Sequence, residues 1–230
     1  NKEAFKYTGG ILSIVNNTDL TQSDSINYDF LNALEGFSDY EVGVSHFLEM
    51  YEGQLNKSVT FNGDIILIEG KLGIASPNNE DTTINARSGI NSIDGGIQMQ
   101  GKGTLNLIAG DEIGLVDIKL NMGEGNLNMM AQNLNVSDSQ VSGTGNLYLN
   151  TADTSGIQTI ILGSTGGDDW DLYIKPEYFR SGGLFSNLTG RVYIGLLPDG
   201  TITKAPINLT GSTNINNELY LATQDDILGY

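Results

Sequence analysis

The sequence predicts a mainly β protein in which short strands stack in repeated coils. Apolar residues alternate with polar residues over short stretches, and one phrase recurs as "GKGTLNLIA", "GEGNLNMMA" and "GTGNLYLNT", beginning at Gly101, Gly123 and Gly143. Each copy reads Gly-x-Gly, one polar residue, then Leu-x-Leu or Leu-x-Met. A repeat of about 20–25 residues is typical of stacked β arrays. We therefore expect a β-solenoid or an intertwined, fibre-like β structure.

The apolar-x-apolar triplet continues along the chain in altered form. Its first positions are 105, 127, 147, 172, 192 and 219. A glycine before each strand allows a corner because it adopts positive φ without a Cβ clash. A similar coil then covers the strand edge about 4.8 Å away. The middle position should face outward, and it changes from Asn at 106 and 128 to Tyr later. An exposed ladder that suits sugar rings or another chain is therefore expected from Tyr148, Tyr173, Tyr193 and Tyr220.

A β-sandwich or jelly roll is the alternative fold. Short Leu-x-Leu strands after glycine are common in β proteins, and the intervals between triplets are irregular. Hairpins of similar length would produce a related pattern. "LPDGTI" (197–202) predicts a tight turn, because Pro198 and Asp199-Gly200 occupy suitable turn positions.

The first 60 residues differ from the rest and predict a small N-terminal α+β head. Helically spaced apolar residues indicate a short helix within 23–37, with Ser23 or Asp24 as its cap. A second helix is predicted within 41–55. The predicted domains are therefore the head, 1–60, and a β-rich repeat-like region, 61–230.

The period of the apolar pattern becomes two after residue 58. Asn62-Gly63 lies between two apolar pairs and is a strong tight-turn signal. The polar residues 76–96 predict a long loop or a weakly formed coil of the same architecture.

The composition excludes several function classes. A formal net charge of −17 disfavours binding to nucleic acid and to anionic membrane surfaces. The chain has no Cys, which removes disulfides, Cys-based zinc sites and thiol catalysis. Its apolar runs fall short of the ~18 residues that a membrane helix requires.

The stretch "GGDDWDLYIKPEYF" (166–179) carries the densest chemistry in the chain. Clustered carboxylates suit a Ca²⁺ site, and an aromatic ring beside carboxylates suits a sugar site. An acidic turn that leads into a strand, with no ligand, would account for the same residues. The candidate metal ligands are Asp168, Asp169 and Asp171, with Trp170 as a ligand contact and Glu177 as a further carboxylate.

The single histidine, His46, offers little for catalysis. With no second His and no Cys it cannot complete a typical zinc site, and the G-x-S-x-G elbow is absent. We expect a structural or surface role for it, and no catalytic residue. A polysaccharide-active β-helix enzyme is the alternative, using Asp168, Asp169, Asp171 or Glu177.

The G-x-G-x-L-x-L phrases and the segment 191–230 resemble phage tail-fibre, tailspike and other virion spike proteins in style. The resemblance covers roughly residues 97–230 and implies a homotrimer, a structural or receptor-binding role and no cofactor. We therefore expect a non-enzymatic component of a virion or extracellular surface. Its N-terminal part would attach to other assembly proteins, and its β part would contact a host surface glycan or neighbouring subunits. A capsid or capsid-decorating β-sandwich protein is a further alternative.

Overall fold

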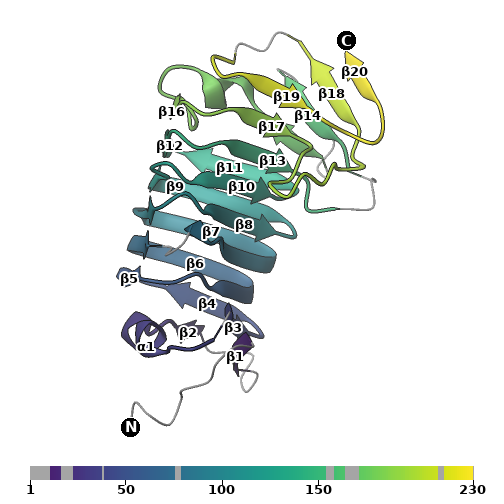
Figure 1. Cartoon of the computed structure of the whole chain (residues 1–230). Coiled ribbons are helices and arrows are strands. Elements are labelled where there is room, and N and C mark those ends of the chain that lie inside the picture. Colours follow the sequence, from purple (N-terminus) through teal and green to yellow (C-terminus); the bar gives the residue numbers. More distant parts are fainter. Residues whose placement is uncertain are drawn as a thin grey trace.

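The chain forms a β-solenoid of about seven turns, seen in a computed structural model (Figure 1). The structure describes residues 11–16, 23–37, 39–75, 79–153, 158–163, 171–211 and 215–229. Strands make up 58% of the chain and helix 6%, so the predicted mainly β, stacked-strand class is confirmed. Every pairing between the named strands is parallel, which excludes the antiparallel sandwich alternative.

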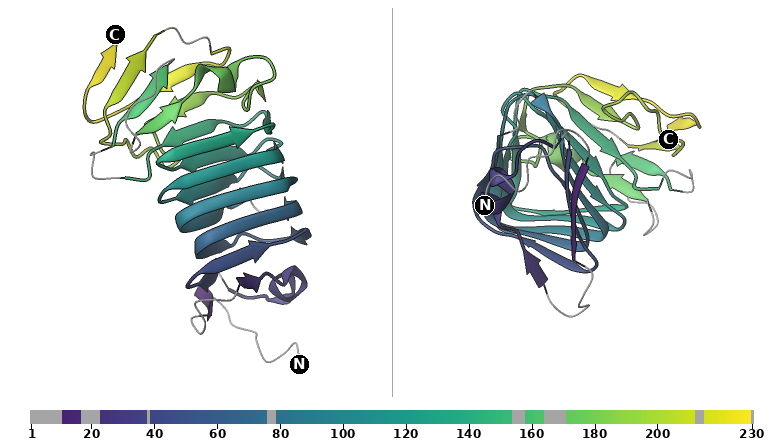
Figure 2. Two further views of the ribbon diagram at one scale, coloured as in Figure 1. Left: turned by 180° about the vertical axis from the view of Figure 1, so that it is seen from behind. Right: turned by 60° about the horizontal axis from the view of Figure 1, so that its bottom comes forward.

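Most coils have three walls, which surround a roughly triangular interior (Figure 2). The long strands β6 (Thr60–Ala75) and β7 (Thr82–Gln100) bend around all three walls. The first face is completed by β1 (Ile11–Asn16), β3 (Asp39–Val44), β8 (Thr104–Ala109), β10 (Asn126–Met130), β13 (Leu147–Asn150), β17 (Val192–Ile194) and β19 (Leu219–Leu221). The second face adds β2 (Ser23–Ser25), β4 (Phe47–Met50), the start of β9 (Glu112–Asn121) and β11 (Asn133–Ser137). The third face adds β5 (Gly53–Leu55), the end of β9, β12 (Gln140–Gly143) and β16 (Asn187–Leu188).

The C-terminal coils replace the second wall with a separate sheet. This sheet has the parallel order β15 (Leu172–Ile174), β14 (Ile160–Gly163), β18 (Ile207–Thr210) and β20 (Ile227–Gly229). A short 3₁₀ helix, η3 (Pro176–Phe179), follows β15 and leads back toward β16. Figure 1 shows β14, β18 and β20 of this sheet at the C-terminal end of the stack.

The interior consists of columns of apolar side chains, one from each coil. On the second face, residues 48, 66, 90, 113 and 134 share one register position and are all buried. The first face contributes an equivalent column, and burying each large apolar side chain stabilises the fold by about 1.5–3 kcal/mol. The members of that column are Phe61, Ile84, Leu107, Met129, Leu149, Ile194 and the half-buried Leu221.

The recurrent phrase marks equivalent positions of successive coils. Leu105, Leu127 and Leu147 are register partners, and the ladder continues through Val192 and Leu219. The first glycine of each phrase has positive φ, as the corner requires. The second glycine meets the coil below. A Cβ on Gly145 would lie 2.0 Å from the carbonyl oxygen of Gly125.

Asx side chains at the same corner join one coil to the next. Asn126 Oδ1 accepts a hydrogen bond from Asn146 N at 2.9 Å, and Asn146 Oδ1 accepts from Arg191 N at 3.1 Å. Asp81 Oδ1 does the same for Thr104 N at 2.6 Å. These bonds satisfy backbone donors at corners where the strand ladder is interrupted.

The N-terminal region corrects one helix prediction and shortens the other. The helix predicted within 23–37 is α1 (Tyr28–Ala33), and its cap is Asn27, whose Oδ1 accepts from Phe30 N at 2.9 Å. Ser23 and Asp24 lie in β2 instead. The second predicted helix, 41–55, is wrong, because that segment forms β3, β4 and β5, all paired in parallel with β6. The coil ladder therefore crosses the boundary predicted after residue 60.

Two turn predictions have different outcomes. The predicted tight turn at Asn62-Gly63 is wrong, because β6 continues through it with a register shift between Gly63 and Ile65. The LPDGTI turn is confirmed, with Leu197 N donating to Thr201 O at 2.8 Å. Residues 76–78 lie outside the described residues, and for 79–96 the coil reading is correct, since β7 begins at Thr82.

Candidate functional site

The outward column of the first face changes chemistry along the stack. In the middle coils, Asn106 Nδ2 donates to Thr83 Oγ1 at 3.3 Å, and Asn128 Nδ2 donates to Asn106 Oδ1 at 2.9 Å. The next register partner of Asn128 is Tyr148, where the aromatic part of the column begins. A polar hydrogen-bonded ladder thus becomes an aromatic stack at the C-terminal coils.

The aromatic stack contains Tyr148, Tyr193 and Tyr220. The ring centroids of Tyr148 and Tyr193 are 4.9 Å apart, and those of Tyr193 and Tyr220 are 5.0 Å apart. Exposure increases toward the end, from 9% at Tyr148 to 38% at Tyr220. Burial raises the pKa of Tyr148 above its usual value. Tyr220 therefore presents the accessible ring of this stack.

Charged groups surround Tyr220. Arg191 Nε lies 2.8 Å from Glu218 Oε2, and the Arg191 guanidinium lies 5.6 Å from the centre of the Tyr220 ring. The Tyr220 hydroxyl donates a hydrogen bond to Glu218 Oε1. This bond, followed by the bond from Arg191, lowers the pKa of Glu218 and holds it as a carboxylate.

Tyr173 is not part of the ladder, which corrects the sequence prediction. It lies in β15, whose partner is β14 of the separate sheet. Its hydroxyl donates to the carbonyl oxygen of Gly163 at 2.8 Å. The local triplet is a strand as expected, but its neighbours belong to another wall.

Only part of the candidate metal cluster lies within the described residues. Asp168, Asp169 and Trp170 lie outside the described residues. Asp171 Oδ1 accepts a hydrogen bond from Thr159 N at 3.0 Å, which ties β15 to the chain entering β14. Glu177 is exposed and lies 3.7 Å from Arg180. Within the described ranges, no group of three or more acidic or His side chains is arranged to hold a metal ion.

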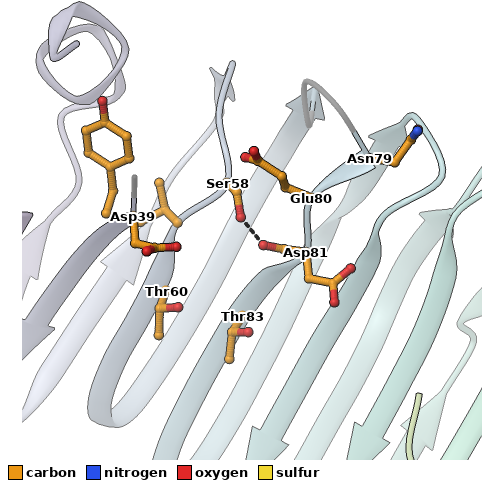
Figure 3. A pocket seen from close by; sticks show the side chains of 9 residues that line it. Asp39, Ser58, Thr60, Asn79, Glu80, Asp81 and Thr83 are labelled. Atoms are coloured by element: carbon orange, nitrogen blue, oxygen red, sulfur yellow. Dashed lines mark hydrogen bonds between the residues drawn. The ribbon is translucent and has the colours of Figure 1, made fainter. Parts of the chain in front are cut away.

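An open acidic pocket lies at the corner where three coils enter the first face (Figure 3). Asp39, Glu80 and Asp81 bring three carboxylates to its lining, beside Ser58 and neighbouring threonines. Ser58 Oγ donates to the carbonyl oxygen of Asp81, and the Asp81 carboxylate accepts from Thr104 N. Asp81 thus fixes the corner, and Asp39 and Glu80 complete the acidic lining of the pocket.

A second pocket, of about 310 Å³, adjoins the aromatic stack. Met130 and Asn150 contribute from β10 and β13, and Leu197, Ile202 and Lys204 contribute from the segment that follows β17. Sequence reasoning missed this pocket. One signal for it was the LPDGTI turn, whose position opposite β13 depends on pairing between distant segments.

His46 has a structural role at the corner between β3 and β4. Its carbonyl oxygen accepts hydrogen bonds from Asp64 N at 2.9 Å and from Ile65 N at 3.0 Å. These two hydrogen bonds to the neighbouring coil hold the bend of β6. Both bonds use the main chain, so the predicted structural or surface role of the His46 side chain stays a prediction.

Comparisons with protein-family models, curated proteins and solved structures found no match to this chain. Among the described residues, no helix has the length and apolar character needed to cross a membrane. The function must therefore be argued from the surfaces of the solenoid itself.

Proposed function

We propose that this protein is a non-enzymatic structural and receptor-binding component of a virion or extracellular surface appendage. The observation that carries the proposal is the aromatic stack that ends on the exposed ring of Tyr220. The coils before it form a continuous ladder of backbone hydrogen bonds, which suits a stiff projecting element. Attachment through the N-terminal part places the aromatic end away from the assembly.

The proposed ligand of the aromatic end is a surface glycan. Within the described residues, β19 is the last strand of the first face, so no further ring stacks on Tyr220. An exposed tyrosine with a hydrogen-bonding hydroxyl suits the apolar face and the hydroxyls of a sugar. The acidic chain, at −17, favours neutral over acidic glycans.

Glycan-array binding tests this role. Tyr220→Ser should abolish binding, whereas Tyr51→Ser should not, because Tyr51 is at least as exposed as Tyr220 but follows β4 near the other end. Equal binding by the parent and Tyr220→Ser would remove the aromatic end from the proposal. Circular dichroism of both variants controls for folding.

The second face supports association of copies into the proposed homotrimer. Ile65, Leu67 and Val116 are half-buried on its outer side, and Ile93 is 45% exposed. Apolar side chains on the outer side of a sheet face are a common component of interaction surfaces. A second copy of this chain is the occupant that we propose.

Light scattering and unheated SDS gels test the assembly. The parent should have the mass of a trimer, and Ile93→Lys should shift it to monomer. Gln98→Lys, on the exposed third face, is the matched control and should remain assembled. A monomeric parent would contradict the homotrimer.

The acidic pocket favours one second candidate, a polysaccharide-active enzyme. Glycoside hydrolysis needs two carboxyl groups, and Asp39 and Glu80 line one pocket. Release of reducing ends from neutral and acidic polysaccharides tests it. Cleavage by the parent that Asp39→Asn and Glu80→Gln abolish would establish it, and the absence of cleavage would remove it.

A further inference from the structure

The pocket beside the aromatic stack has a preformed outer wall. Leu197 N donates to Thr201 O at 2.8 Å and Gly200 N donates to Leu197 O at 3.0 Å, which closes the LPDGTI turn. Leu196 and Ile202 form an antiparallel bridge, and Gln224 Nε2 donates to Ile202 O at 3.0 Å. The wall is therefore held by hydrogen bonds within the chain and needs no ligand to form.

Asn150 provides the polar group of the opposite wall. Its side chain is 1% exposed, and its Nδ2 donates to Leu196 O at 3.0 Å. Its Oδ1 is buried and has no hydrogen-bond partner among the described residues. A buried acceptor without a donor costs about 1–3 kcal/mol, so a donor that reached Oδ1 from the pocket would stabilise the site.

The remaining lining defines the chemistry of the ligand. Met130, Leu197 and Ile202 provide apolar surface, and Thr151 and Thr201 add hydroxyl groups. Asp153 and Lys204 contribute one charge of each sign, so the lining is neutral overall. An anion would also be opposed by the net charge of −17. A neutral ring with hydroxyl donors and an apolar face fits these walls.

The size of the pocket limits the ligand to a small one. About 310 Å³ lies at the lower end of the range for small-molecule sites. One sugar ring is therefore a better match than an extended oligosaccharide.

We propose that this pocket binds one neutral monosaccharide unit, with the ring lying between Met130 and Ile202 and the Asn150 side chain turning so that its Oδ1 accepts a hydrogen bond from a ligand hydroxyl. The inference shares the glycan class with the proposed function, but it uses residues that the aromatic end does not use. The two can therefore fail separately.

Saturation-transfer NMR and calorimetry with glucose, galactose and N-acetylglucosamine test the site, each at millimolar concentration. The parent should bind at least one of these sugars. Thr201→Trp should abolish binding by filling the pocket from its exposed rim. Asn150→Leu should weaken binding about tenfold, the effect of one lost hydrogen bond. Gln98→Trp, which adds the same ring on the third face, should leave binding unchanged.

The outcomes separate the pocket from the aromatic end. Loss of binding in Thr201→Trp with full binding in Tyr220→Ser supports the pocket. Loss in Tyr220→Ser with full binding in Thr201→Trp overturns the pocket and leaves the proposed function standing. Tighter binding of glucuronic acid than of glucose overturns the neutral ligand, and no binding of any of the three sugars overturns the inference altogether.

Discussion

The rings of Tyr148 and Tyr193 stack face to face, with planes inclined by 12°, although strands β14 and β15 lie between them in the sequence. The stack forms because Tyr148 and Tyr193 are register partners in β13 and β17. The excursion through the separate sheet thus returns the chain to the first face in register. Tyr193 lies between two rings and should stabilise the C-terminal coils more than either neighbour does.

Tyr193→Ala should therefore lower the free energy of unfolding by about 2 kcal/mol. It removes two ring contacts, each worth about 0.5–1.5 kcal/mol beyond the buried area. Tyr193→Phe keeps both rings in contact and should lose less than half as much. Urea denaturation followed by circular dichroism measures both variants. Equal losses in the two would show that the hydroxyl matters more than the stack.

The second glycine of each recurrent phrase packs against the coil below. Replacing it should lower stability more than Tyr193→Ala does, although the substitution is smaller. Gly145→Ala places a methyl group 2.0 Å from the Gly125 carbonyl oxygen, and backbone must move to relieve the clash. We expect a loss of about 3 kcal/mol, the upper part of the range for overpacking. Gly89→Ala is the matched control, because its nearest contact would be an ordinary 3.5 Å. Thermal melts compare the two, and similar melting temperatures would contradict the close-packed column.

The stacked fold could be predicted because its rules are local. The same phrase occurs once in each of three successive coils: a corner glycine, a polar residue and a Leu-x-Leu or Leu-x-Met triplet. It therefore identifies the inward positions 105, 127 and 147. The triplet does not specify which wall it joins. Tyr173 follows the same local pattern and still pairs with β14, because strand partners are set by the path of the whole coil.

The incorrect helix at 41–55 has a geometric cause. Leu48 and Met50 face inward on one wall, and Val42 faces inward on the wall before it. The corner at His46 shifts the alternation between these walls, and the combined spacing imitates a helix. Phe47 and Tyr51 are less buried than Leu48 and Met50, so the apolar side chains of this segment do not share one buried face.

The LPDGTI turn alone could not predict the pocket at Asn150, because the two walls of the pocket come from distant segments. The position of Asn150, two residues after Tyr148 in β13, indicates an outward side chain. Nothing local shows that the segment after β17 folds over it. The burial of Asn150 and its bond to Leu196 are tertiary features.

The Asn and Asp side chains that join successive coils at their corners form an Asx ladder. This ladder predicts which replacements the corners tolerate. Asn146→Ala removes the acceptor for Arg191 N and should lower the free energy of unfolding by about 1–2 kcal/mol, as loss of a helix cap does. Asn146→Asp keeps an acceptor oxygen, as Asp81 does in its own coil, and should lose less than half of that. Chemical denaturation at neutral pH distinguishes the two. Equal stability of the alanine variant and the parent would contradict the ladder.

Tyr178 predicts how the stability of the fold depends on alkaline pH. Its hydroxyl donates to Leu134 O at 3.1 Å, and burial raises its pKa to about 12 from 10.0. The folded state therefore favours the protonated phenol. The stability that this preference supplies is complete below pH 10 and is lost as the pH rises toward 12. Tyr178→Phe cannot ionise, and at pH 8 it should be less stable than the parent by about 1 kcal/mol, the value of the lost hydrogen bond.

The stability difference between the parent and Tyr178→Phe should then shrink between pH 10 and 12, because only the parent must hold this phenol protonated. Urea denaturation of both proteins at pH 8, 10 and 11 measures the difference. A stability difference for Tyr178→Phe that stays constant across this range would show that the phenol at 178 ionises as easily in the folded coil as in the unfolded chain.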